Sequence, residues 1–246
     1  MPKLTKVDSR ALLRNLSFFA DLTGPELDTL VAASTTRMYA PREVVFSEGD
    51  AGDATYAVSH GWLKVVATGP DGQQATLSLM GTGEAFGELA VLDGGPRSAT
   101  VVALEPTLLL VLERARFHQL LQSSPSLAYK MLIVTARRLR RLSERVEDVE
   151  FLDVPARLAK KLTELAERHG TPLGDGRVRV KMRLSQRELG GLINATRESI
   201  NKHLKLLAEN GLVEQKAGGE LLVRPERLRE LAEQGSARVW AAWKRR

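Results

Sequence analysis

The stretch Gly83-Glu-Ala-Phe-Gly-Glu-Leu-Ala-Val-Leu-Asp-Gly-Gly-Pro-Arg-Ser-Ala-Thr100 interrupts a regular series of short apolar runs in the first half of the chain. Gly87 lets the backbone turn or approach a ligand closely. Residues 88–92 predict one helical turn, and the free N–H groups at its start suit an anion. Arg97 and Ser98 follow, and a guanidinium with a hydroxyl and free N–H groups favours a phosphate. A surface ion pair at Arg97 and an ordinary acidic residue at a helix start would give the same pattern.

The short apolar runs around this stretch are separated by glycine-rich turns between residues 37 and 112. Many short strands with such turns are typical of an antiparallel sandwich or barrel. Asp71-Gly72 is a tight-turn signal between two strands. A short amphipathic helix is expected before them, over residues 12–30. The runs lie at residues 43–47, 55–59, 62–66, 75–80 and 98–103.

A long helix is predicted over residues 126–149, where apolar residues recur at alternating spacings of four and three. This seam is typical of two helices that pair along their length. A helix packed on its own domain has the same periodicity, so that alternative stays open. Self-pairing is favoured because five arginines between residues 137 and 145 leave only a narrow apolar stripe. The seam consists of Ala128, Leu132, Thr135, Leu139, Leu142, Val146 and Val149.

The heptad pattern ends at residues 150–156. Asp153 can cap a following helix, and Pro155 fits the first turn of that helix. The helix is predicted over residues 156–168, with leucines on one stripe. We place a domain boundary at residue 153, in a short hinge that could absorb a ligand-driven rotation.

Residues 184–207 predict two short helices around a tight turn. Ser185 and Glu188 form a capping box at the start of the first helix. Asn194 tolerates the left-handed backbone of a sharp turn, and Thr196 can cap the second helix. The second helix has an apolar inner face and a basic outer face, as in a DNA-binding helix-turn-helix. The inner residues are Ile200, Leu204 and Leu207, and the outer residues are Arg197, Glu198, Asn201, Lys202 and Lys205.

Two further features favour DNA binding over an ordinary helical hairpin. A strand at 177–182 precedes the helices, and strands at 211–214 and 220–223 joined near Gly218-Gly219 predict a wing. Residues 155–246 contain 20 Lys or Arg and 11 Asp or Glu, whereas residues 1–154 contain 16 and 19. A basic second part fits a polyanionic partner, although a solvated basic surface is the alternative.

The composition excludes several classes of protein. The chain has no cysteine, which rules out disulfides, thiolate zinc sites and cysteine-ligated clusters. No apolar run approaches the ~18 residues of a membrane span. The first residues lack the apolar run of a signal peptide, so a cytoplasmic location without a membrane partner is expected. No catalytic triad, Walker loop or histidine-rich metal spacing is present, so we expect neither enzymatic activity nor a metal or haem.

Residues 86–92 and 96–100 resemble the phosphate-binding cassette of cyclic-nucleotide-binding domains. The order of cassette, long helix and helix-turn-helix over residues 15–224 is similar to that of the bacterial cyclic-AMP receptor (catabolite activator) family, in the fumarate-nitrate-regulator superfamily. The resemblance implies an α+β fold with an N-terminal antiparallel, jelly-roll-like β-barrel, a dimerisation helix and a C-terminal winged helix-turn-helix. The expected domains are 1–125, 126–152 and 153–224, followed by a helical extension over 225–246.

The resemblance also implies the residues that bind a nucleotide. In the family the arginine neutralises the cyclic phosphate, the serine adds a hydrogen bond, and the Gly-Glu pair holds ribose and phosphate. A Thr-Ser pair on the long helix contacts adenine, and this chain has leucine in place of the threonine. The implied residues are Gly87, Glu88, Leu89, Arg97, Ser98, Val65, Leu77, Ser78, Leu142 and Ser143.

For DNA, Thr196-Arg-Glu-Ser199 resembles the Ser-Arg-Glu-Thr that begins the family's recognition helix. There the arginine and glutamate contact bases and the hydroxyl residues contact phosphate. Lys202 takes the place of a third base-contacting arginine. The implied DNA contacts are Ser185, Arg187, Thr196, Arg197, Glu198, Ser199 and Lys202.

The expected protein is a homodimeric transcription regulator that pairs through residues 128–149. Cyclic AMP is expected to regulate its binding to a palindromic site in double-stranded DNA, where it would act with RNA polymerase. The alternative is a regulator of the same fold that is constitutive or responds to another ligand, such as a cyclic dinucleotide. Leu142 favours the alternative, whereas the intact Glu88 and Arg97-Ser98 favour a cyclic nucleotide.

Overall fold

The computed structural model covers the 246 residues and describes residues 23–69, 74–181, 185–216 and 220–234. The chain forms two compact units, Met1–Arg140 and Arg141–Arg246, which are described separately. The division falls inside α5 (Pro125–Phe151), the long helix that contributes to both units.

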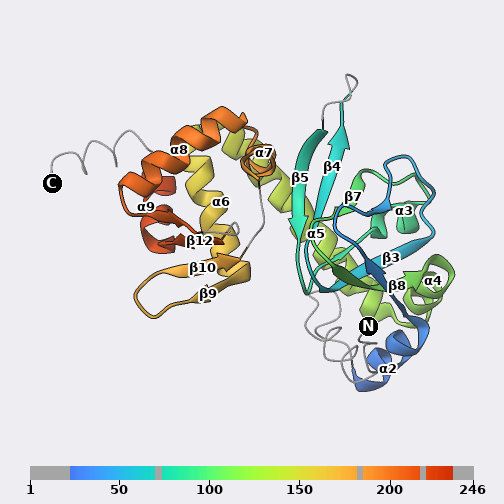
Figure 1. Ribbon diagram of the computed structural model, residues 1–246. Helices are drawn as coiled ribbons and strands as arrows, with labels where there is room; N and C mark the ends of the chain where they lie inside the picture. The colour runs from blue at the N-terminus through green and yellow to red at the C-terminus, as the bar shows by residue number, and fades with distance from the viewer. Residues whose placement is uncertain (1–22, 70–73, 182–184, 217–219, 235–246) are drawn as a thin grey trace. The chain divides into compact units, whose positions relative to one another are not determined.

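The first unit contains two four-stranded antiparallel sheets (Figure 1). One has the order β1 (Thr35–Tyr39), β8 (Thr107–Glu113), β3 (Ala54–His60), β6 (Ala85–Phe86). The other has the order β2 (Val44–Phe46), β7 (Thr100–Ala103), β4 (Leu63–Thr68), β5 (Gln74–Met80). The predicted strands are confirmed, and the structure adds β1, β6 and β8.

The predicted barrel is not closed. No ladder joins the two sheets among the described strands, so the unit is a sandwich, the other architecture that the pattern of short strands allowed. Residues such as Tyr39, Val58, Leu63, Val101 and Leu109 form the apolar core of this unit.

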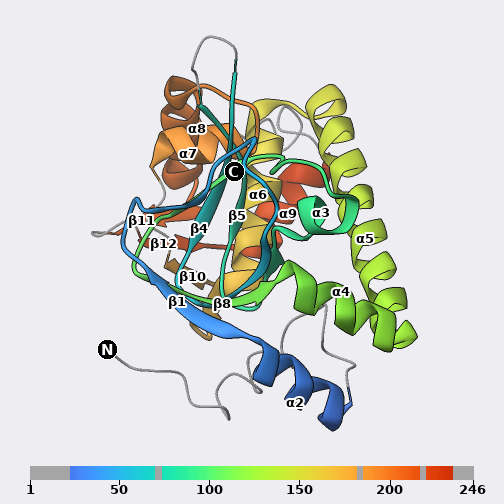
Figure 2. The same cartoon turned by 90° about the vertical axis from the view of Figure 1, so that its right-hand side faces the viewer.

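Helices cover one side of the sandwich, as Figure 2 shows. A second apolar cluster joins α2 (Gly24–Ala33), α4 (Arg114–Ser123) and the first half of α5 to β3 and β8. Leu27, Phe117 and Met131 are buried in it. The remaining helix, α3 (Glu88–Asp93), is the helical turn predicted after Gly87, and Gly94 ends it in a left-handed conformation.

The second unit consists of helices packed on a sheet of order β11 (Val213–Gln215), β12 (Glu220–Val223), β10 (Val178–Lys181), β9 (Gly170–Pro172). Its helices are α6 (Val154–His169), α7 (Gln186–Leu192), α8 (Arg197–Glu209) and α9 (Pro225–Gln234). The predicted helix-turn-helix and the two wing strands are confirmed.

The C-terminal extension begins as the predicted helix. α9 packs on α6, with Leu228 and Leu231 fully buried and Arg229 donating to Glu167 at 2.5 Å. The rest of the extension, residues 235–246, lies outside the described residues, as do the first part of the predicted opening helix, the Asp71-Gly72 turn and the Gly218-Gly219 turn.

Candidate nucleotide and DNA sites

The backbone of Arg97 is fixed against a neighbouring glycine turn. The Gly49 N–H donates to the Arg97 carbonyl at 2.9 Å, and the Arg97 N–H donates to the Asp50 carbonyl at 2.8 Å. Ala51 and Pro96 form a β-bridge beside this pair. The cassette arginine therefore starts from a rigid backbone position.

The guanidinium of Arg97 is buried, with 2% of the residue exposed. Nη1 donates to the Gly87 carbonyl at 2.7 Å, while Nη2 donates to the Ala54 carbonyl at 2.9 Å and to Asp53 Oδ1 at 2.8 Å. The ion pair to Asp53 joins a buried cation to a carboxylate whose side chain is 80% exposed. Only one of these three acceptors carries charge, and it is also the one that solvent reaches.

Aromatic rings and one unused donor complete the surroundings of this cation. The guanidinium carbon of Arg97 lies 4.2 Å from the centre of the Phe46 ring and 5.6 Å from that of Tyr56, which are cation–π distances. Its Nε is buried and has no hydrogen-bond partner among the described residues. A buried cation with a donor to spare fits an anionic ligand.

Gly87 makes the close packing of the cassette possible. It has a φ of 77°, in the left-handed region. A Cβ at this position would lie 2.9 Å from Arg97 Nη1 and 3.2 Å from Tyr56 Cδ2. The glycine identified in the sequence is required by both conformation and space.

Glu88 is 4% exposed and ion-paired with Arg138 of α5. Arg138 also donates to the Ala85 carbonyl, so it holds the segment that leads into the cassette helix. This contact links the cassette to the long helix inside the first unit.

The other residues implied for the nucleotide are dispersed. Val65 is buried, Ser78 is half-buried, and Leu77, Leu89 and Ser98 are exposed. Leu142 and Ser143 lie on the exposed surface of α5 within the second unit. The structure thus brings together Gly87, Glu88 and Arg97.

Sequence reasoning missed two residues of this cluster, Asp53 and Arg138. Both come from segments far from the cassette in sequence. Asp53 directly follows one of the glycine-rich turns, for which the sequence predicts a turn and no site, and Arg138 is one of the five arginines beside the predicted seam of the long helix. A carboxylate directly after the glycine turn was the one available signal for Asp53.

Helix α5 has two apolar faces. Leu127, Met131 and Val134 are buried against the first unit, so the packing alternative holds for one face of the first half of the helix. The predicted seam occupies the other face: Leu132, Leu139 and Val146 are 69%, 66% and 71% exposed. Exposed large apolar side chains in a continuous row indicate a contact surface.

The helix-turn-helix has the helix caps that the sequence predicts. The Ser185–Glu188 capping box is present, and the Thr196 hydroxyl accepts from the Ser199 N–H at 3.1 Å. Asn194 has a φ of 53°, in the left-handed region. Gly190 was not singled out in the sequence, yet a Cβ there would lie 2.4 Å from the Ala195 carbonyl oxygen, so only glycine allows α7 to approach the turn.

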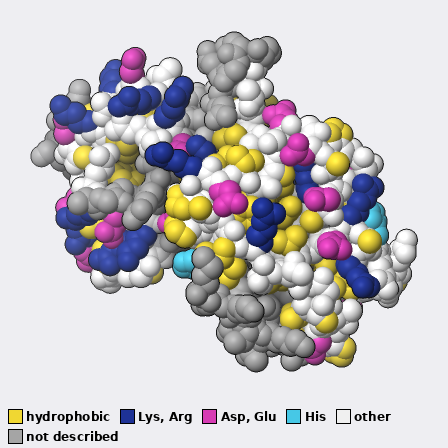
Figure 3. Space-filling view, turned by 45° about the vertical axis from the view of Figure 1, so that its right-hand side comes forward, with side chains coloured by type: hydrophobic (Ala, Val, Ile, Leu, Met, Phe, Trp, Pro, Cys, Tyr) yellow, Lys and Arg dark blue, Asp and Glu magenta, His cyan; other side chains and the backbone are white. Residues whose placement is uncertain are grey.

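The implied DNA contacts lie on the outer face of α8 and at the start of α7. Arg197, Glu198 and Lys202 are exposed, as are Ser185, Arg187 and Thr196, while Ser199 is half-buried. Ile200, Leu204 and Leu207 are buried on the inner face. Figure 3 shows lysine and arginine side chains gathered over the second unit, which gives it a surface suited to phosphates.

One further arginine joins this motif to the end of α5. Arg157 of α6 donates to the Ile193 carbonyl at 2.9 Å and to the Leu152 carbonyl at 2.6 Å. Asp153 caps α6 by accepting from the Ala156 N–H at 3.0 Å, as predicted. The turn of the motif and the α5–α6 junction are therefore tied to one side chain.

No helix of the described segments is long and apolar enough to cross a membrane. Among the same residues, no group of three or more histidine or acidic side chains could hold a metal ion.

Comparison with known proteins matches both units. Residues 36–124 match the cyclic nucleotide-binding domain, and residues 156–231 match the Crp-like helix-turn-helix domain. The chain is 36% identical over 184 residues to a CRP-like cAMP-activated global transcriptional regulator of Mycobacterium tuberculosis, covering 75% of this chain and 82% of that protein. It is 33% identical to the cyclic AMP receptor protein of Thermus thermophilus, covering 82% and 89%.

Solved structures show the same architecture. The catabolite activator protein of Thermus thermophilus has a TM-score of 0.51 at 33% identity, over 89% of this chain and 99% of that one. The c-di-GMP responsive regulator CLP of Xanthomonas campestris has a TM-score of 0.66 at 26% identity, over 82% and 99%.

These matches and the two sites define the class of protein: a transcription regulator with a cyclic-nucleotide-binding domain and a DNA-binding helix-turn-helix. The chain belongs to the CRP-like family of these regulators. Its relatives are regulators of transcription and not enzymes.

Proposed function

We propose that this protein is a cytoplasmic homodimer that cyclic AMP switches and that reads a palindromic DNA site, acting with RNA polymerase. The observation that carries the proposal of a cyclic phosphate ligand is the buried Arg97, packed against Gly87 beside Glu88. A cyclic phosphate next to this cation would take the place of Asp53 as its anion. Two relatives above 30% identity are named for cyclic AMP, which supports the same ligand.

We assign a role to each part of the chain by the domain boundaries that the sequence predicts. Residues 1–125 would bind the nucleotide, 126–152 would form the dimer helix, 153–224 would bind DNA, and 225–246 would extend the second unit. Val65, Leu77, Leu89 and Ser98 would line the nucleotide site, with Leu142 and Ser143 contributed by the long helix. The exposed seam over residues 128–149 would be covered by the same helix of a second copy.

On DNA, the outer face of α8 would enter the major groove. Arg197 and Glu198 would contact base edges, with Ser185, Arg187, Thr196 and Ser199 at phosphates. Lys202 would read bases less strictly than an arginine, because an ammonium lacks the planar fork that matches guanine.

A cyclic dinucleotide is the second candidate ligand. Leu142 stands where the family has an adenine-contacting threonine, and CLP, a structural relative, is named for c-di-GMP. A larger ligand would still need a cation such as Arg97 for a phosphate.

Calorimetry with cyclic AMP, cyclic GMP and cyclic di-GMP tests the proposal. We expect the wild type to bind cyclic AMP, and Arg97→Gln to lose at least tenfold in affinity, since a hydrogen bond to a charged group is worth about 1.5–3 kcal/mol. Arg116→Gln, which changes an exposed arginine on α4, is the matched control. Circular dichroism checks that both variants fold. Equal binding by Arg97→Gln contradicts the cassette assignment, and binding of cyclic di-GMP alone favours the second candidate.

A further inference from the structure

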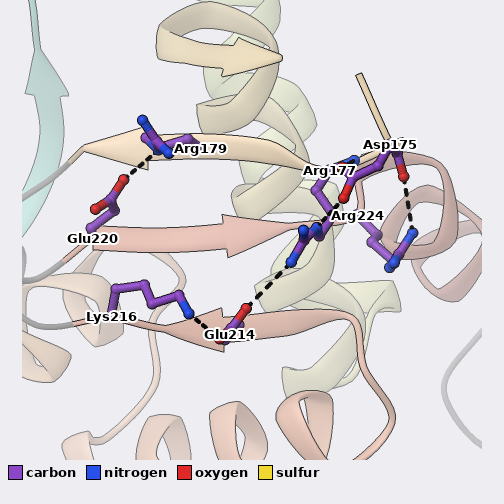
Figure 4. A network of polar contacts seen from close by, with 7 residues as sticks. All are labelled: Asp175, Arg177, Arg179, Glu214, Lys216, Glu220 and Arg224. Carbon is purple, nitrogen blue, oxygen red and sulfur yellow. Dashed lines mark hydrogen bonds and ion pairs between the residues drawn. The ribbon is translucent and has the colours of Figure 1, made fainter. Parts of the chain in front are cut away.

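The outward face of the wing sheet carries a network of paired charges, shown in Figure 4. Alternate residues of an extended segment share a face, so Glu214 of β11 and Lys216, the residue that follows this strand, lie on the same side. The Lys216 ammonium donates to Glu214 Oε1. Arg177 reaches the other oxygen of the same carboxylate, with its Nη1 3.5 Å from Oε2. Asp175 binds Arg177 more closely, with its Oδ2 2.6 Å from the arginine Nε, so Lys216 is the cation that depends on Glu214.

A second pair in the same sheet provides a comparison. Arg179 of β10 and Glu220 of β12 are joined at 2.6 Å. Glu220 lies across the hairpin from Lys216, but its carboxylate is bound to Arg179, whereas the carboxylate of Glu214 is bound to Lys216. The two carboxylates are thus matched in charge and differ in the cation that each one binds.

Lys216 is fixed where the wing begins. Its N–H donates to the Glu220 carbonyl at 2.8 Å, which closes the hairpin between β11 and β12. The hairpin follows α8 directly, because the Leu212 N–H donates to the Leu207 carbonyl at 3.0 Å and β11 starts at Val213. A cation at this point follows the recognition helix closely in the chain.

Glu214 carries a full charge at neutral pH. The hydrogen bond from Lys216 lowers the pKa of its carboxyl, and the nearby charge of Arg177 adds to this effect. A DNA phosphate that approaches Lys216 therefore meets a carboxylate already bound to the same ammonium.

We propose that Glu214 sets the DNA affinity of this protein by holding Lys216 in an ion pair that a phosphate must displace. The inference rests on the proposed DNA binding by the winged unit. Affinity for DNA falls with salt in proportion to the phosphate contacts that release counterions. A lysine that is paired with a carboxylate neutralises less of the phosphate charge, so fewer counterions leave the DNA when the protein binds. Glu214 therefore both weakens DNA binding and flattens its salt dependence.

Fluorescence anisotropy of the full-length protein on a duplex that carries its selected site tests this role, at several potassium chloride concentrations and with saturating cyclic AMP. We expect Glu214→Gln to bind about three- to tenfold more tightly near 0.1 M salt, with a log–log salt slope steeper by about one for each bound subunit. Glu220→Gln makes the same change of charge in the same sheet and should stay within about twofold of the wild type.

A double-mutant cycle separates release of Lys216 from a general gain of positive charge. In the Lys216→Gln background, Glu214→Gln should lose most of its effect on affinity and on slope. The proposal is overturned if the effect persists in that background, or if Glu214→Gln and Glu220→Gln behave alike. A wild type that binds no DNA in a salt-dependent manner overturns the proposed function as well, whereas wild-type binding with no specific Glu214 effect overturns this inference alone.

Discussion

Gly87 is the residue on which the cassette geometry depends most directly. Gly87→Ala would place a side chain in the left-handed region, which costs about 1–2 kcal/mol, and would press a methyl group against Arg97 Nη1 at 2.9 Å. We therefore expect loss of nucleotide affinity beyond the loss of stability, measured by calorimetry and by urea unfolding.

Gly49→Ala is the control for that substitution. Gly49 has a similar φ of 88°, and a Cβ there would meet nothing within 4 Å. Gly49→Ala should lower the free energy of unfolding through its left-handed backbone alone. It should leave the side chain of Arg97 undisturbed. Equal loss of nucleotide binding in both variants would contradict the role given to the contact between Gly87 and Arg97.

His169, the last residue of α6, makes the stability of the second unit depend on pH. Burial, with a smaller contribution from Arg168, lowers its pKa from 6.5 to about 4. Between these values the unfolded chain binds a proton that the folded chain does not, so the free energy of unfolding decreases as the pH falls below 6.5. At pH 5.5 the loss is about 1 kcal/mol relative to pH 7.5.

Urea unfolding of the wild type and of His169→Gln at the two pH values measures this loss. The variant should retain only a weaker pH dependence in this window, because burial also lowers the pKa of His203. An unchanged pH dependence in the variant would show that His169 is not the group responsible.

Residues that act locally could be predicted from the sequence, and residues that act over distance could not. The caps Asp153, Ser185 and Thr196 bond to N–H groups three residues away, so spacing alone identifies them. Asp53 is 44 residues from Arg97, and Arg138 is 50 residues from Glu88. Only the folded sandwich brings these partners together.

At the scale of elements, α5 shows what periodicity can and cannot settle. The spacing of four and three identified the exposed seam, but the row formed by Leu127, Met131 and Val134 packs on the sandwich with the same period. Similarly, short strands predicted a sandwich or barrel without deciding between them. That choice depends on hydrogen bonds between edge strands, which no local pattern encodes.

The exposed seam leads to a prediction about assembly. Leu139→Asp would place a carboxylate from each subunit in an apolar contact, where two buried like charges cost several kcal/mol. Sedimentation at micromolar concentration should show a dimer for the wild type and a monomer for this variant. Arg137→Asp introduces the same side chain on the opposite face of the helix and should leave the dimer intact. A dimeric Leu139→Asp would move the interface elsewhere.

At the scale of the whole molecule, α5 is the element that both units share. Its first part belongs to the unit that holds the cassette, and its second part belongs to the unit that holds the helix-turn-helix. Arg138 binds the cassette through Glu88 and Ala85, while Arg157 binds the end of α5 to the turn before α8. A change at the cassette therefore has a covalent and hydrogen-bonded path to the DNA-binding motif.

If nucleotide binding raises DNA affinity, DNA must raise nucleotide affinity by the same factor, commonly 5- to 150-fold and so about 1–3 kcal/mol. Arg138→Gln removes the charge that holds Glu88 to α5. We expect it to reduce both factors equally while leaving DNA affinity without nucleotide within about twofold, because the helix-turn-helix itself is untouched.

Four titrations measure the two factors: DNA with and without cyclic AMP, and cyclic AMP with and without DNA. Arg137→Gln, one residue away, is the control, since Arg137 is exposed and has no ion pair within the described residues. If Arg138→Gln keeps the full effect of cyclic AMP on DNA affinity, other contacts must connect the cassette to the DNA-binding motif. A loss of coupling in Arg137→Gln of the same size would mean that the charge of α5, and not its contact with Glu88, carries the effect. A loss confined to Arg138→Gln identifies the Glu88–Arg138 pair as the point where the ligand acts on the long helix, because only there does α5 contribute a charge to the cassette among the residues that the structure describes.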